Sequence, residues 1–150
     1  FANQYLAYEQ LSDGLKQTLK GLKLVSRSDN KDTAETRATR IKESGVKLNS
    51  DSLSGCHPVI RTHPETGRKS LYVSPGHSGN FEGWSEKESA ALLSYLHNYQ
   101  IAEEFRCRHI WQLGDLAIWD NRCVLHYPVN DYHGHRRLLH RITLKGDIPA

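Results

Sequence analysis

The chain has 150 residues, of which 37% are hydrophobic and 25% are charged, and its formal net charge at pH 7 is +3. This length suits one domain, and the composition is typical of a soluble globular protein. No apolar run approaches the ~18 residues of a membrane span, and no basic-then-apolar signal pattern is visible, so neither a membrane partner nor a targeting segment is predicted.

The cysteines and the basic residues limit the cellular location and the partners that the sequence predicts. Cys56, Cys107 and Cys123 have no C-x-x-C spacing. Their odd number argues against a complete disulfide framework, so a reducing, cytoplasmic location is predicted. Positive charge is concentrated at residues 16–47, where no aromatic residue interrupts the lysines and arginines. A solvated surface is therefore a better interpretation than a nucleic-acid site.

The chain begins with helical patterns. Residues 2–10 are helix-prone, and Ser12 is the predicted N-cap of a second helix, whose apolar residues Leu15, Leu19 and Leu22 recur at helical spacing. We assign these leucines to the core. A strand is predicted to start near residues 24–25.

Residues 26–54 are polar and only weakly periodic, with one short helix predicted at 33–43. A hairpin follows, with strands at 58–62 and 70–73. His63 and Glu65, in the turn between them, have the H-x-D/E spacing of two ligands in a two-histidine, one-carboxylate iron site. Because Pro64 and Gly67 favour a turn, we prefer a turn to a metal site.

The middle of the chain holds the clearest helix signal. Residues 74–84 are rich in glycine but match no phosphate-binding loop. Ser85 and Glu88 have the spacing of a capping box, and leucines follow at helical spacing, so a helix is predicted at 86–99.

Four strands are predicted in the last third, at 105–111, 116–119, 124–127 and 136–144. In the last of these, Arg137 and Arg141 share one face, and at about 3.3 Å per residue their Cα atoms lie roughly 13 Å apart. This spacing suits two anionic groups better than one carboxylate. Taken alone, alternating arginine and leucine is more typical of a solvated face.

One motif favours a functional site over a solvated face for these arginines. The order Trp-Asp-Asn-Arg at 119–122, then His126, then Arg-Arg-x-x-His-Arg at 136–141 resembles the C-terminal signature of the taurine dioxygenase (TauD/TfdA) family. The resemblance continues, in the same order along the chain, through residues 1–19, 57–73 and 85–93. Members of that family are Fe(II)- and 2-oxoglutarate-dependent oxygenases.

The resemblance implies a fold and an extent. The fold is mainly β with flanking helices, a double-stranded β-helix or jelly roll. Residues 1–150 would form the C-terminal portion of a single dioxygenase domain lacking its N-terminal part. Residues 26–54 would be either a mobile lid over the active-site mouth or a surface loop.

The resemblance also implies site residues. His126 matches the distal histidine ligand of Fe(II), and Arg137 matches the arginine that pairs with the far carboxylate of 2-oxoglutarate. Arg141 matches the arginine that meets the acidic group of the substrate, and His77 lies where taurine enzymes carry a phenylalanine. No side chain is predicted to act as a catalytic acid or base, because the iron performs the oxidation. Trp119 fits equally well near the metal or in the core.

Other histidines are poorer metal ligands. His133 and His135 are predicted in a loop, and His140 faces away from the two arginines by strand parity. The family's H-x-D ligand pair and its 2-oxoglutarate-binding threonine have no counterpart in this sequence. An isolated polypeptide of this extent is therefore expected to be poorly active and prone to aggregate.

Two functions remain open. The first is a dioxygenase that uses Fe(II), 2-oxoglutarate and O2 to hydroxylate a small anionic substrate, such as a sulfonate, an alkyl sulfate or an aryloxy or carboxylic acid, with release of succinate and CO2. The second is a non-catalytic, anion-binding jelly-roll module that has lost the metal site. The identity of the substrate is open, and so is the choice between monomer and homo-oligomer.

Overall fold

The computed structural model describes residues 1–27, 54–129 and 131–149. The predicted helix at 33–43 lies outside these residues. So does the predicted loop at 26–54, except for its two ends, which belong to strands. Within the described part of the chain, no helix is long and apolar enough to cross a membrane.

The predicted opening helices are confirmed with small changes. A two-residue strand, β1 (Ala2–Asn3), precedes α1 (Gln4–Glu9), and α2 is Asp13–Leu19. The Asn3 side chain caps α1 by accepting two backbone N–H groups from its first turn. The hydroxyl of Ser12, the predicted N-cap of α2, accepts a backbone N–H from the first turn of that helix at 3.3 Å. Both caps satisfy N–H groups that a helix start leaves without partners.

A three-stranded antiparallel sheet follows. The central strand, β2 (Lys23–Arg27), lies between β3 (Ser54–Pro58) and β6 (Ser78–Phe81). Leu24 of β2 is 1% exposed and lies opposite one residue of each neighbouring strand. The strand predicted from residues 24–25 is therefore confirmed.

The predicted hairpin is also confirmed. Its strands, β4 (Ile60–Thr62) and β5 (Lys69–Leu71), are antiparallel. The turn between them is closed by Gly67, which has φ 68° and donates its N–H to the carbonyl oxygen of His63 at 2.9 Å. Such a positive φ suits glycine, which has no Cβ.

The β4–β5 hairpin has an unusual inner face. Val59, Arg61 and His63 alternate with more exposed residues and are all buried, with Arg61 only 3% exposed. Successive side chains of a strand point to opposite faces, so these three residues share one face. A buried arginine needs a charged or polar partner, and the partner comes from elsewhere in the chain.

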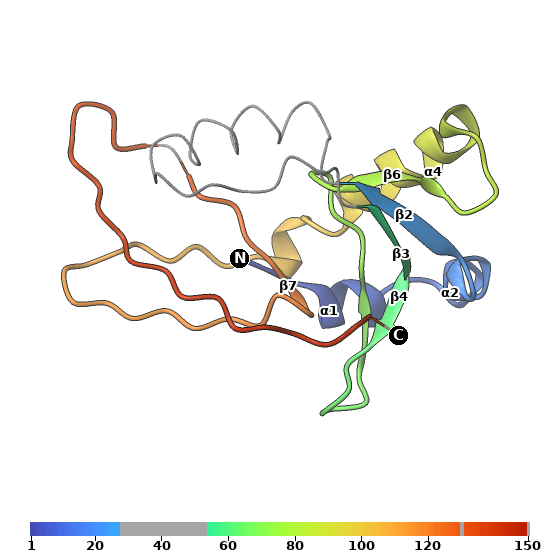
Figure 1. Ribbon diagram of the computed structural model, residues 1–150, viewed down its shortest axis with the longest axis horizontal. Helices are drawn as coiled ribbons and strands as arrows, with labels where there is room; N and C mark the ends of the chain where they lie inside the picture. The colour runs from blue at the N-terminus through green and yellow to red at the C-terminus, as the bar shows by residue number, and fades with distance from the viewer. Residues whose placement is uncertain (28–53, 130, 150) are drawn as a thin grey trace.

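Helix α4 (Glu86–Tyr99), the most clearly predicted helix, packs on β6 (Figure 1). Its predicted capping box is present: Ser85 accepts the Glu88 backbone N–H, and the Glu88 side chain accepts the Ser85 N–H. The core beneath α4 joins helices, sheet and hairpin through Leu11, Leu19, Leu24, Val59, Leu71, Val73, Phe81, Leu93 and Leu96.

The chain after α4 departs most from the predicted elements. It forms a short 3-10 helix, η1 (Glu103–Phe105), and one two-residue strand, β7 (Val124–Leu125), which pairs with β1. Otherwise it runs as long irregular loops on the side of the molecule away from α2 (Figure 1).

The predictions of strands at 105–111, 116–119 and 136–144 are therefore wrong, and the one at 124–127 is too long. Alternation shows only that a segment could lie on a sheet, whereas a strand also needs a neighbour for its backbone hydrogen bonds. Among the described residues, only β1 offers that neighbour. Both parities of the last segment are exposed: Ile142 is 90% exposed, and Leu139 and Arg141 are exposed as well.

Truncation of the core at Leu96 should destabilise the fold strongly. Leu96 is 0% exposed beneath α4, so Leu96→Ala leaves a cavity and should lower the free energy of unfolding by about 2–5 kcal/mol. The control is Ser94→Ala on the exposed face of the same helix, which should stay within about 0.5 kcal/mol. Urea unfolding measures both, and equal losses would contradict this description of the core.

Removal of the α4 cap should have a smaller effect. Ser85→Ala deletes the acceptor for the Glu88 N–H and should cost about 1 kcal/mol of stability. Ser85→Thr keeps the hydroxyl and should unfold at nearly the wild-type urea concentration. A Thr variant as unstable as the Ala variant would argue against the capping role.

Candidate functional site

His126, the predicted metal ligand, directly follows β7 and lies in an aromatic environment. The centroid of its ring is 4.9 Å from that of Trp119 and 6.4 Å from that of Phe1. These two rings cover part of the imidazole, while the residue as a whole remains exposed. Burial against them lowers the pKa of His126, and the positive charges of Arg141 and the N-terminus lower it further. The neutral imidazole that results is the form that binds a metal ion.

The other predicted site residues are placed differently. Arg141 is close enough for its charge to act on His126. The guanidinium of Arg137 instead lies 5.3 Å from the centroid of the Tyr132 ring. His77 is exposed just before β6, where its carbonyl oxygen accepts the Arg27 N–H at 2.8 Å. The structure thus packs Trp119 against His126 and places Arg141 within electrostatic range of it. The proposed roles of His126, Arg137, Arg141 and His77 all stay predictions.

The residues at His126 fit an Fe(II) site in part. A neutral imidazole with an exposed edge is a suitable ligand, but a facial triad needs a second histidine and a carboxylate. Within residues 1–27, 54–129 and 131–149, no group of three potential ligands includes His126. His126 can therefore supply one of the three ligands.

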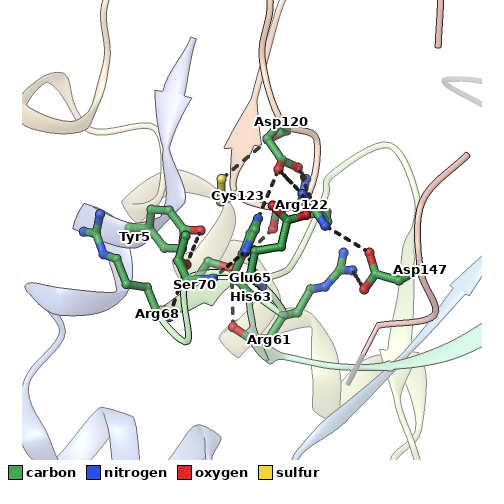
Figure 2. Close-up of polar contacts among 11 residues, drawn as sticks. Tyr5, Arg61, His63, Glu65, Arg68, Ser70, Asp120, Arg122, Cys123 and Asp147 are labelled. Carbon is green, nitrogen blue, oxygen red and sulfur yellow. Dashed lines mark hydrogen bonds and ion pairs between the residues drawn. The ribbon is translucent and has the colours of Figure 1, made fainter. Parts of the chain in front are cut away.

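A polar network is centred on the carboxylate of Asp120, the residue that follows Trp119 in the chain (Figure 2). Arg122 donates from Nε to both carboxylate oxygens, at 3.0 and 2.9 Å, and from Nη2 to Oδ2 at 2.7 Å. The Arg122 backbone N–H also donates to Oδ1 at 2.8 Å. The guanidinium of Arg122 holds the pKa of Asp120 far below its usual range, so this carboxyl group stays ionised.

His63 contributes a further donor from the turn of the β4–β5 hairpin. Its Nδ1 accepts the backbone N–H groups of Glu65 at 3.2 Å and Thr66 at 3.3 Å. This assigns the ring proton to Nε2, which donates to Asp120 Oδ2 at 3.0 Å. The turn interpretation of His63 and Glu65 is confirmed, and His63 also links the hairpin to a segment 57 residues away.

The same network reaches the end of the chain. Arg122 donates to Glu65 Oε1 at 3.0 Å and to Asp147 Oδ1 at 3.4 Å. Buried Arg61 donates to Asp147 Oδ2 at 2.6 Å, so Asp147 joins two arginines. Figure 2 shows Arg61, His63 and Glu65 on the hairpin facing Asp120, Arg122 and Asp147.

His63, Asp120 and Cys123 each offer a ligand atom, and these atoms lie within 4.8 Å of one another. Two facts argue against a cation there. Both nitrogens of the His63 ring already have hydrogen-bond partners, and the positively charged Arg122 occupies both oxygens of Asp120. The cluster is better described as a satisfied hydrogen-bond network.

The sequence analysis missed this network, although a signal for part of it was present. Arg61 and His63 have the same parity as Val59 in a strand that was correctly predicted, so their burial could have been inferred. No local signal pointed to Asp147, which lies 86 residues from Arg61.

Comparison with known proteins identifies the family. The model of the taurine catabolism dioxygenase TauD, TfdA family matches residues 1–143. An alkylsulfatase of Acinetobacter baylyi is 36% identical over 155 residues, covering 99% of this chain and 47% of that protein. An alpha-ketoglutarate-dependent 2,4-dichlorophenoxyacetate dioxygenase of a Burkholderia species is 34% identical over 151 residues, covering 97% of this chain and 48% of that protein.

A solved taurine dioxygenase from Burkholderia xenovorans superposes with a TM-score of 0.64 and 34% identity, covering 81% of this chain and 36% of that one. This likeness confirms the predicted double-stranded β-helix class for the part of the fold that the chain covers. The chain spans 37–50% of the length of the first three curated relatives. With a family match over nearly its whole length and a shared fold, the chain belongs to the taurine catabolism dioxygenase (TauD, TfdA) family of 2-oxoglutarate-dependent oxidoreductases.

Proposed function

We propose that the chain is the C-terminal portion of a dioxygenase domain that uses Fe(II), 2-oxoglutarate and O2 to hydroxylate a small anionic organic substrate. Succinate and CO2 are the other products. The observation that supports this function best is the environment of His126, which is exposed, packs on Trp119 and lies within electrostatic range of Arg141.

Four residues have proposed roles. His126 binds the metal, and Arg137 pairs with the far carboxylate of 2-oxoglutarate through its planar, permanently charged guanidinium. Arg141 meets the acidic group of the substrate, and His77 contacts the rest of it. Fe(II) supplies the oxidising chemistry when it is bound. Its other ligands would be residues beyond those that the described part of the chain places at His126.

The proposed substrate class is a sulfonate, an alkyl sulfate or an aryloxy acid. These three classes share an acidic head group that Arg141 could bind, and relatives are named for alkyl sulfate and aryloxyacetate substrates. We further propose a cytoplasmic protein, because all three cysteines are free. Neither nucleic acid nor a membrane is a proposed partner.

A second candidate function is a non-catalytic jelly-roll module that binds anions. The observation in its favour is that, among the described residues, no group of three potential metal ligands includes His126. The two functions differ in whether the full-length protein binds Fe(II).

Anaerobic titration of the full-length protein with Fe(II) and 2-oxoglutarate distinguishes them. We expect a weak visible charge-transfer band that disappears in His126→Ala, because the variant lacks one ligand. The control is His133→Ala, which removes an exposed histidine from a loop and should keep the band. A folded wild-type protein without the band would favour the anion-binding module.

The role of Arg137 can be tested separately. Arg137→Lys keeps the charge but loses the bidentate geometry, so the Kd for 2-oxoglutarate should rise about tenfold or more. Arg136→Lys is the matched control, since the same change is made one residue earlier, and it should bind 2-oxoglutarate as the wild type does. Isothermal titration of the Fe(II)-loaded protein gives both constants. Equal effects of the two substitutions would remove the proposed role.

A further inference from the structure

We propose that the β4–β5 hairpin positions the site: through Arg61, His63 and Glu65 it holds the two segments that carry His126 and Arg141. This role rests on the proposed function, because it matters for catalysis only if His126 binds the metal. The three hairpin residues are positioning residues, which act through Asp120, Arg122 and Asp147 and not by contact with substrate.

The need for such support follows from the backbone. After η1, β7 contributes the only strand residues among the described ones, and the apolar side chains of this last third of the chain are largely exposed. Neither ladder hydrogen bonds nor core packing fixes residues 107–129 and 131–149 well. Segments with so few buried contacts unfold locally at a low cost in free energy unless other bonds hold them. Beside a few backbone hydrogen bonds, charged side-chain hydrogen bonds connect this part of the chain to the hairpin.

The first link runs from the hairpin to His126. His63 holds the Asp120 carboxylate, and the carbonyl oxygen of Asp120 accepts the Cys123 N–H at 3.2 Å, which closes a turn. The Cys123 carbonyl oxygen then accepts the Gln4 N–H at 2.9 Å, where β7 begins to pair with β1. His126 follows β7 directly. The hairpin therefore fixes the turn at residues 120–123, and β1 fixes β7. Together they hold the segment before His126 from two sides.

The second link runs to the segment of Arg141. Arg61 and Arg122 both donate to Asp147, six residues beyond Arg141. Arg61 is held in turn by burial and by its position 5.0 Å from the centroid of the Tyr72 ring. Arg122 also donates to Glu65 at 3.0 Å, so the hairpin turn contacts the 120–123 turn at two points. One hairpin thus holds both segments relative to each other.

The test uses His63→Leu, which deletes the donor to Asp120, and His63→Gln, whose amide nitrogen can replace Nε2. Leu96→Ala serves as a control that is destabilised at a remote site. Amide hydrogen exchange is measured on the metal-free full-length protein, and the Kd for Fe(II) in the presence of 2-oxoglutarate is measured on the same samples. Glu65→Ala removes the acceptor of the second contact at an exposed side chain, where a substitution should leave the fold intact.

In His63→Leu we expect exchange at residues 120–126 to accelerate about tenfold or more and Fe(II) affinity to fall by a similar factor, the range typical of groups that orient a metal ligand. His63→Gln should restore most of both, and Glu65→Ala should show a smaller effect in the same residues. Leu96→Ala should lower the melting temperature without this local pattern.

Two results would overturn the positioning role. One is that His63→Leu gives the same exchange rates and the same Fe(II) affinity as Leu96→Ala. The other is that exchange at residues 120–126 accelerates in His63→Leu while its Fe(II) affinity is unchanged. If the folded wild type binds no Fe(II) while exchange still accelerates in His63→Leu, the proposed function fails and the structural link between hairpin and turn stands.

Discussion

The structure depends on one shared carboxylate. Asp120 accepts hydrogen bonds from Arg122 within its own turn and from His63 on a hairpin 57 residues away. A partly buried carboxylate is costly unless its charge is compensated, and here a guanidinium and an imidazole N–H compensate it together. Because hydrogen bonds from Arg122 keep the pKa of Asp120 very low, this carboxylate stays ionised near neutral pH.

This network explains how the irregular last third of the chain keeps a defined course. Regular strands are held by backbone bonds to their neighbours, whereas in residues 107–129 and 131–149 only β7 has such a neighbour. Arg61 and Asp147 supply a different constraint, a charged hydrogen bond of 2.6 Å at a nearly buried guanidinium. Loss of Asp147 would leave the buried charge of Arg61 without this partner, so the return of the chain end to the hairpin is stabilising.

The environment of His126 has the same dependence on distant contacts. Phe1 and Trp119 pack around its ring, and Phe1, 125 residues away in the sequence, is brought there by the pairing of β1 with β7. The lowered pKa of His126 is a result of that packing and of the nearby positive charges. A change in the turn at Asp120 would therefore alter the position of the imidazole.

Local sequence patterns determined the elements whose stabilising interactions lie within a few residues. The Ser85 capping box, the Ser12 cap and the turn at Gly67 were all predicted, because each depends on hydrogen bonds or backbone conformation inside one turn. The order of the motif residues around His126 likewise indicated the family, because a motif can be recognised without knowledge of three-dimensional contacts.

Only the tertiary structure decided the rest. The alternating pattern at 136–144 could not show that this segment has no strand partner among the described residues. Strand pairing depends on segments that are remote in the sequence. The partners of Arg61 and His63 lie 86 and 57 residues away, beyond the reach of any local pattern. Burial of a charge can be inferred from strand parity, but the partner that makes this burial tolerable is determined by how the whole chain folds.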